Sequence, residues 1–264
     1  MGFVDTFHSL ATLVFVVGSG LVGVRLLVLS ARTRRAPEFL LGGAILLTAV
    51  LGYGFLIACW IIRGAAATTS PESATPFTIA LFGAGKVFHD LGVTLFLLFV
   101  MHVFRRGDRR AWAFTGVLLL LLWGGLAASV ARGHLRSDPV GSPGWFAEYS
   151  VIWTYSLWNV VESYRYWAMM RRRSRVGIVE PMVTNRFFLW GTSSVFTSLA
   201  TWIASVPYLY MADPGRLDAI TPAVRIATAL VGLVSISCAL LAFVPPAWYR
   251  RLVLSGAQQA PESA

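Results

Sequence analysis

Four ionisable side chains lie within one apolar stretch of the chain, residues 78–104. Lys86, the only lysine in the sequence, is followed by His89, Asp90 and His102. Ionisable groups inside a bilayer are costly, and those that occur there are typically functional. Lys86 and Asp90 are four positions apart, so a helix would place them on one face, where an ion pair lowers the cost of both charges. We expect a polar network here, either a ligand or ion site or an interhelical contact that sets helix register.

Two histidines on one apolar stretch raise the question of haem. His89 and His102 are 13 positions apart, which corresponds to a rotation of about 220° on a helix, so they lie on different faces. A second ligand pair is also missing, since His8 falls at a helix start and His134 in a loop. We therefore expect no haem. No His, Cys and Asp residues show metal-ligand spacing, so we expect no metal site either.

A second polar pattern follows residues 145–170, the most aromatic of the apolar runs. Tyr155, Asn159 and Glu162 recur at the spacing of a single helical stripe, and Arg165 is the nearest intrahelical partner of Glu162. An interfacial salt bridge within an aromatic belt would explain part of this pattern. We expect Asn159 and Glu162 to face the protein interior, and we treat all four residues as an intramembrane polar stripe.

Further polar residues occur toward the predicted outer ends of two later runs. Trp202 and Tyr208 follow a hydroxyl-rich segment that favours helix packing, and Arg225 enters the last run at about the depth of Lys86. Two cations at one depth would suit an anionic head group or acid. If the helices bring these groups together, they form a ligand-binding cavity open to the outside, lined by Lys86, His89, Asp90, Trp202, Tyr208 and Arg225.

The composition indicates a membrane protein. Of the 264 residues, 56% are hydrophobic and only 13% are charged, against roughly 25% charged residues in soluble domains. The net charge of +10 comes largely from arginines in short loops between apolar runs, so we expect no nucleic-acid partner. Cys59 and Cys238 fall within apolar runs at different predicted depths, so we expect no disulfide.

Seven apolar runs are each long enough to cross a bilayer. We therefore predict an all-α membrane protein, a single bundle of seven transmembrane helices over residues 1–250 with a short polar tail at 251–264. The predicted helices are 8–30, 38–62, 78–104, 111–131, 145–170, 185–211 and 223–245.

The arginines indicate an orientation. Thirteen lie in the loops after the first, third and fifth runs and in the tail: Arg32, Arg34, Arg35, Arg105, Arg106, Arg109, Arg110, Arg171, Arg172, Arg173, Arg175, Arg250 and Arg251. Four lie on the opposite side: Arg63, Arg132, Arg136 and Arg216. Because basic loops stay in the cytoplasm, we predict an outer N-terminus and a cytoplasmic C-terminus.

This topology resembles that of microbial rhodopsins and G-protein-coupled receptors. The resemblance is one of topology, covers the whole chain and has no motif to support it. HVFRRGD and FVPPAWY are only weakly similar to receptor motifs. Microbial rhodopsins bind retinal through a lysine on the seventh helix, and the run AVRIATALVGLVSISCALLAFV has none, so we expect no retinal or other cofactor. The Arg-, Leu-, Ala- and Gly-rich texture is similar to that of a bacterial seven-helix family, which implies a multi-pass protein of the bacterial inner membrane.

Several functions are compatible with these patterns. We expect a non-enzymatic receptor or sensor that lies in the lipid bilayer, binds a small amphiphile, lipid or anionic ligand in the outer cavity and signals to a cytoplasmic protein. The alternatives are a secondary transporter or ion and proton pathway that uses the intramembrane charges, and a structural subunit of a membrane complex. A lipid-modifying enzyme is less favoured, because adjacent His89 and Asp90 point about 100° apart on a helix.

Overall fold

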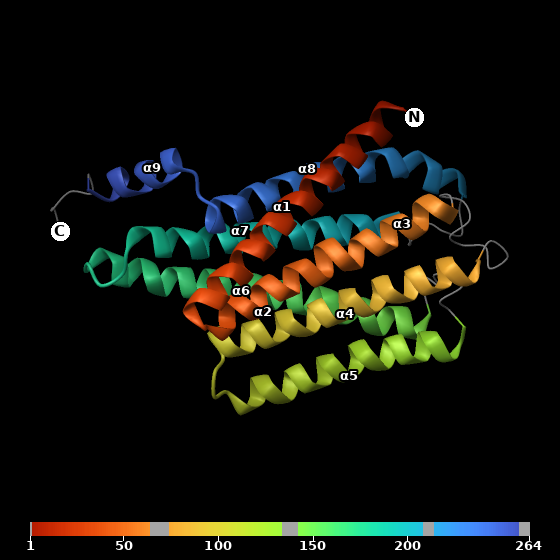
Figure 1. Cartoon of the computed structure of the whole chain (residues 1–264), viewed down its shortest axis with the longest axis horizontal. Helices are drawn as coiled ribbons and strands as arrows, with labels where there is room; N and C mark the ends of the chain where they lie inside the picture. Colours follow the sequence, from red (N-terminus) through yellow and green to blue (C-terminus); the bar gives the residue numbers. More distant parts are fainter. Residues whose placement is uncertain (1, 64–73, 134–141, 208–213, 259–264) are drawn as a thin grey trace. The chain divides into compact units, whose positions relative to one another are not determined.

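This computed structural model describes residues 2–63, 74–133, 142–207 and 214–258. All regular elements of the described residues are helices (Figure 1). In chain order these are α1 (Phe3–Thr33), α2 (Ala36–Ile45), η1 (Leu46–Gly52), α3 (Tyr53–Arg63), α4 (Pro76–Phe104), α5 (Arg109–Ala131), α6 (Pro143–Arg175), α7 (Pro181–Ser205), α8 (Pro214–Phe243) and α9 (Ala247–Gln258).

Local sequence signals explain where several helices begin. Thr75 precedes α4 and forms a capping box, in which its hydroxyl accepts from the Thr78 amide and the Thr78 hydroxyl accepts from the Thr75 amide. Pro76 then occupies the first turn, where a proline costs no hydrogen bond. Asp108 caps α5 by accepting from the Arg110 and Ala111 amides.

Two segments differ from the expected helix pattern. The second apolar run is regular in α2 and α3 but is π-helical in η1 between them. The predicted polar tail is helical at its start, because α9 covers residues 247–258. The last residues of the sixth predicted helix, 208–211, lie outside the described residues.

The long helices have the surface of a membrane protein. Among the described residues, six helical segments are long and apolar enough to cross a bilayer: Phe3–Thr33, Ala36–Arg63, Pro76–Phe104, Arg109–Ala131, Pro181–Ser205 and Asp218–Phe243. Large apolar side chains are exposed along them, including Leu120 at 76%. Exposed apolar surface of this extent is unfavourable in water and favourable against lipid. The protein is therefore a multi-pass integral membrane protein.

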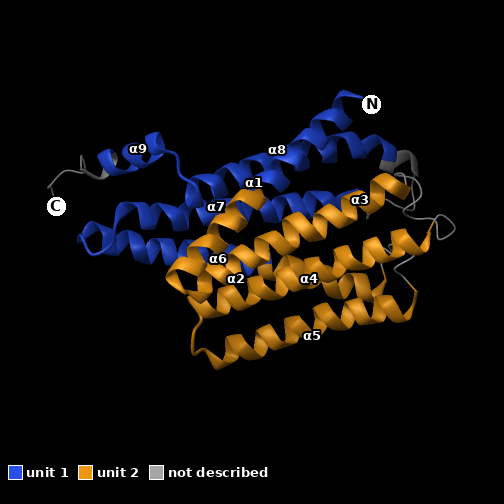
Figure 2. Ribbon diagram, viewed as in Figure 1, with its two compact units in different colours: residues 1–18, 156–207, 215–264 blue, residues 19–155, 208–214 orange. Residues whose placement is uncertain are grey.

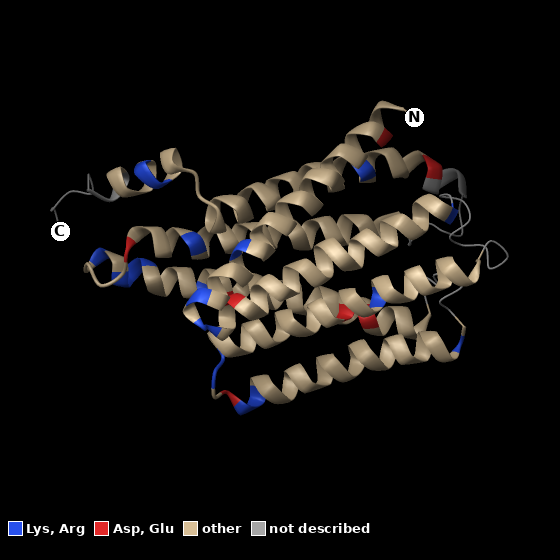
Figure 3. Ribbon diagram, viewed as in Figure 1, with Lys and Arg blue, Asp and Glu red and all other residues tan. Residues whose placement is uncertain are grey.

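Charged residues are distributed unevenly over the helices (Figure 3). Most arginines lie at helix ends and in the short links, as in the Arg-rich end of α6. An exception is a group of acidic and basic residues inside α4 and α6, far from the ends of α4. This group contains the candidate site.

The chain divides into two compact units (Figure 2). Unit 1 comprises residues 1–18, 156–207 and 215–264, and unit 2 comprises 19–155 and 208–214. In unit 2, α4 packs against α2, η1 and α3, and its buried residues include Val93, Leu97 and Met101. In unit 1, hydroxyl groups link α7 to α8, where Ser235 lies 3.1 Å from Ser193 and 2.7 Å from Thr197, oxygen to oxygen.

Candidate functional site

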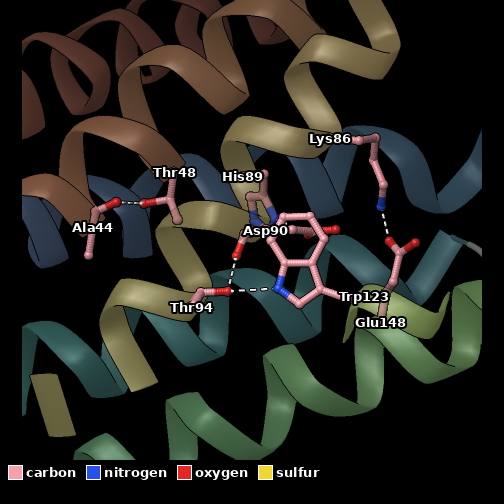
Figure 4. A network of polar contacts seen from close by, with 8 residues as sticks. All are labelled: Ala44, Thr48, Lys86, His89, Asp90, Thr94, Trp123 and Glu148. Carbon is pink, nitrogen blue, oxygen red and sulfur yellow. Dashed lines mark hydrogen bonds and ion pairs between the residues drawn. The ribbon is translucent and has the colours of Figure 1, made fainter. Parts of the chain in front are cut away.

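The candidate site is an ionisable cluster in unit 2, formed by Lys86, His89 and Asp90 of α4 and Glu148 of α6 (Figure 4). Lys86 Nζ donates to Glu148 Oε2 in an ion pair that joins the two helices. The side chains are 18% and 2% exposed, respectively, so this pair is largely removed from the surface. A lysine in an apolar helix is thus neutralised by a carboxylate from another helix.

Glu148 is the member of the cluster that the sequence analysis did not predict. It lies one turn into the fifth predicted helix, seven positions before Tyr155 and 11 before Asn159, so helical spacing places it on the same face as the stripe. It is 62 positions from Lys86, a separation over which helical periodicity carries no information. A second signal was its residue type: Glu148 is one of the few acidic residues within the apolar runs, and a buried lysine calls for a carboxylate.

Asp90 is the most enclosed charged group of the cluster. The residue is fully buried, and its Oδ1 lies 3.2 Å from Nδ1 of His89. Its second oxygen, Oδ2, is also buried and has no hydrogen-bond partner among the described residues. A buried carboxylate oxygen without a partner is costly, so this atom marks a place where a proton or a cation would be stabilised.

Neighbouring side chains hold Asp90 and His89 in place. Thr94 donates to the backbone oxygen of Asp90 at 2.8 Å and accepts from Nε1 of Trp123 on α5 at 3.1 Å (Figure 4). His89 packs edge to face against Tyr53 of α3, with ring centroids 6.2 Å apart. The cluster is thus fixed from α3, α5 and α6 as well as by its own helix.

The π-helical segment η1 lies directly against the cluster's helix. A Cβ atom added at Gly92 would come within 2.7 Å of the Thr48 amide nitrogen and 2.9 Å of the Ala44 oxygen, so α4 touches the backbone of α2 and η1 there. The Gly52 end of η1 is equally close to His89, with 3.0 Å from an added Cβ to the His89 Cα. Short π-helical segments often occur at functional sites. Here one lies beside the buried histidine and aspartate.

The charges of the cluster favour a cationic occupant. With both carboxyls ionised and His89 neutral, two negative charges face the one positive charge of Lys86. In a low-dielectric interior, an excess negative charge attracts a proton or a cation and repels an anion.

Two of the other predicted ligand-binding residues belong to the other compact unit, and a third lies outside the described residues. Lys86, His89 and Asp90 lie together in unit 2, whereas Trp202 and Arg225 belong to unit 1. Arg225 Nη1 donates to Asp5 of α1, and Nδ1 of His8 lies 3.3 Å from the Arg225 backbone oxygen. Trp202 is 38% exposed. Tyr208 lies outside the described residues.

The predicted polar stripe of α6 has well-defined partners. Tyr155 lies against Phe96 of α4 in unit 2, with ring centroids 5.6 Å apart. In unit 1, Asn159 donates to Ser194 Oγ at 2.8 Å, and Glu162 accepts from Nε1 of Trp158 at 3.3 Å. Asn159 and Glu162 are buried, whereas Arg165 is exposed. Asn159 therefore joins α6 to α7, whereas the contact of Glu162 with Trp158 lies within α6.

In the described part of the chain, no group of three or more His, Cys, Asp or Glu residues could hold a metal ion. Cys59 and Cys238 are free thiols. No protein-family model, curated protein or solved structure matches this chain. Fold and site together define the class, an all-helical integral membrane protein with a buried ionisable cluster.

Proposed function

We propose that the protein moves protons across a membrane, as a proton pathway or a proton-coupled secondary transporter, and that Asp90 is its proton-binding group. The observation that carries the proposal is the fully buried Asp90 carboxyl, hydrogen-bonded to His89 through one oxygen and unpartnered at the other. Buried ionisable residues in membrane helices mark proton relays and ion pathways. The Lys86–Glu148 pair beside it supplies fixed charges that tune the site.

The direction of proton movement depends on how the chain crosses the membrane. We propose seven membrane spans in a bacterial cell, with the N-terminus outside and the C-terminus in the cytoplasm. The span that we add to the six apolar segments is α6, whose 33 residues are about 50 Å long as a helix. Its modest hydropathy has a physical reason, since polar residues such as Glu148, Asn159 and Glu162 are buried in protein. The excess of arginines on one side supports the orientation.

A receptor for an anionic amphiphile has less support. That function rests on two free cations, and each has a carboxylate partner in the structure: Glu148 for Lys86 and Asp5 for Arg225. An anion binding at either residue would have to displace that carboxylate. A proton at Asp90 displaces nothing and reduces the net negative charge of the cluster.

Proton flux tests the proposed function directly. The purified protein is reconstituted in liposomes that contain a pH-sensitive dye, and a potassium diffusion potential of either sign is imposed. We expect flux above that of empty liposomes, and we expect Asp90→Asn to reduce it to the empty-liposome level, because an amide cannot carry the proton. The assay contains no transport substrate. It therefore detects proton flux that needs no substrate, either through a proton pathway or as a leak through a transporter.

The matched control is Thr115→Val. Thr115 is 1% exposed in the same unit, and its hydroxyl also lacks a hydrogen-bond partner among the described residues, but it lies on α5 outside the cluster. We expect this variant to keep the wild-type flux. Equal flux in wild type and Asp90→Asn would refute the role of Asp90, and equal loss in Thr115→Val would show that the assay reports general damage.

A further inference from the structure

The last helix, α9 (Ala247–Gln258), is unlike the others. Three residues, Val244, Pro245 and Pro246, separate its start from the end of α8 at Phe243. Its 12 residues are about 18 Å long as a helix, too short to cross a hydrocarbon core of about 30 Å. It therefore continues a membrane-spanning helix without being able to span the membrane itself.

One side of α9 is fixed to unit 1. Nδ2 of Asn185 on α7 donates to the hydroxyl of Tyr249 at 2.8 Å. Tyr249 and Val253, four positions apart on one face, are both partly buried. This contact near the start of α7 restrains the rotation of α9 about its own axis.

Next to this contact, α9 has an exposed apolar surface. Trp248 and Leu252 are 62% and 63% exposed and are four positions apart, so they lie together. They are adjacent to the face of Tyr249 and Val253, and together the four side chains make one continuous apolar side. Exposed Arg250 and Arg251 lie outside this apolar side, on the part of the helix surface that also carries Leu254, 43% exposed. A short helix with apolar and basic sides is typical of the membrane interface.

We propose that α9 lies along the surface of the bilayer and binds anionic phospholipid there. Trp248 and Leu252 enter the boundary between head groups and acyl chains, where tryptophan is favoured. Arg250 and Arg251 contact the phosphate groups of surrounding lipids, which adds electrostatic attraction in an anionic leaflet. A bilayer is the occupant favoured by the structure, because α9 follows α8, whose segment Asp218–Phe243 is long and apolar enough to cross a bilayer.

Depth measurements on the full-length protein test this proposal. A nitroxide is attached at Leu252→Cys or, as the matched control on the opposite side, at Arg250→Cys, both in a Cys59→Ala/Cys238→Ala background. The protein is reconstituted in vesicles of equimolar phosphatidylcholine and phosphatidylglycerol. We expect the label at 252 to be relaxed by oxygen, which is soluble in lipid, and the label at 250 by a water-soluble nickel chelate.

Two results would overturn the membrane position of α9. Relaxation of both labels by the nickel chelate would place the helix in water, and protection of the 252 label from both reagents would show that protein covers this face. The binding of anionic lipid is tested separately. The double variant Arg250→Gln/Arg251→Gln should place the 252 label less deeply in the bilayer, and so should vesicles of phosphatidylcholine alone. An unchanged depth in both cases would remove the role of the arginines. Neither result depends on proton flux.

Discussion

Glu148→Gln is expected to lower the free energy of unfolding by about 3 to 5 kcal/mol, the range found when one partner of a buried ion pair is removed. The reason is that Lys86 then keeps its charge in an apolar helix without the carboxylate that compensates it. Equilibrium unfolding in mixed micelles, followed by circular dichroism, measures the change. The effect should exceed that of any single charge removal at a helix end.

The control for this prediction is a partly exposed ion pair in the link between α4 and α5. Arg105 and Asp108 approach to 3.7 Å with side chains 30% and 40% exposed, so Arg105→Gln should cost at most about 1 kcal/mol. The double variant Lys86→Met/Glu148→Gln should recover much of the stability lost in Glu148→Gln, because no unpaired charge remains. A Glu148→Gln variant as stable as Arg105→Gln would contradict the buried pairing.

Gly92→Ala is expected to cost about 3 kcal/mol, at the upper end for overpacking of a tightly packed core. The added methyl group would lie 2.5 Å from Thr48 Cγ2 and 2.7 Å from the Thr48 amide nitrogen. A flexible side chain could yield, but backbone atoms of η1 cannot move without disturbing the π-helical segment. The same unfolding experiment measures the loss.

Gly116→Ala is the matched control for Gly92→Ala. Gly116 is also a glycine inside a membrane-spanning helix, α5, but an added Cβ there would meet nothing within 4 Å. Alanine is the better helix former by about 1 kcal/mol, so this variant should be as stable as the wild type or more stable. If both variants lost the same stability, the close approach of α4 to η1 would be wrong.

The membrane character and the individual long helices could be predicted from sequence because each depends on local composition. The apolar run of residues 111–131, for example, corresponds closely to α5 (Arg109–Ala131). Helix ends were shifted where caps intervene, as at Thr75 and Pro76 of α4. The segment at η1 could not be foreseen, because LLTAVLG is as apolar as its flanks and its π-helical bonding belongs to a region packed on Gly92.

The candidate site could be predicted only in part. Lys86, His89 and Asp90 were recognised because charge is rare in an apolar run, and one helix brings them together. The pairing of Lys86 with Glu148 and of Arg225 with Asp5 depends on which helices are neighbours, which a single sequence does not reveal. The apolar and basic sides of α9 were present in its sequence, but its two arginines and short length favoured a polar tail.

The protonation of Asp90 is the most direct test of the proposed mechanism. Infrared difference spectra are recorded on the lipid-reconstituted protein between alkaline and acidic buffer, for wild type, Asp90→Asn and Thr115→Val. The proposal predicts a protonated-carboxyl band on acidification that is present in wild type and Thr115→Val and missing in Asp90→Asn. Identical spectra for wild type and Asp90→Asn would contradict it, because Asp90 would then bind no proton over the range tested.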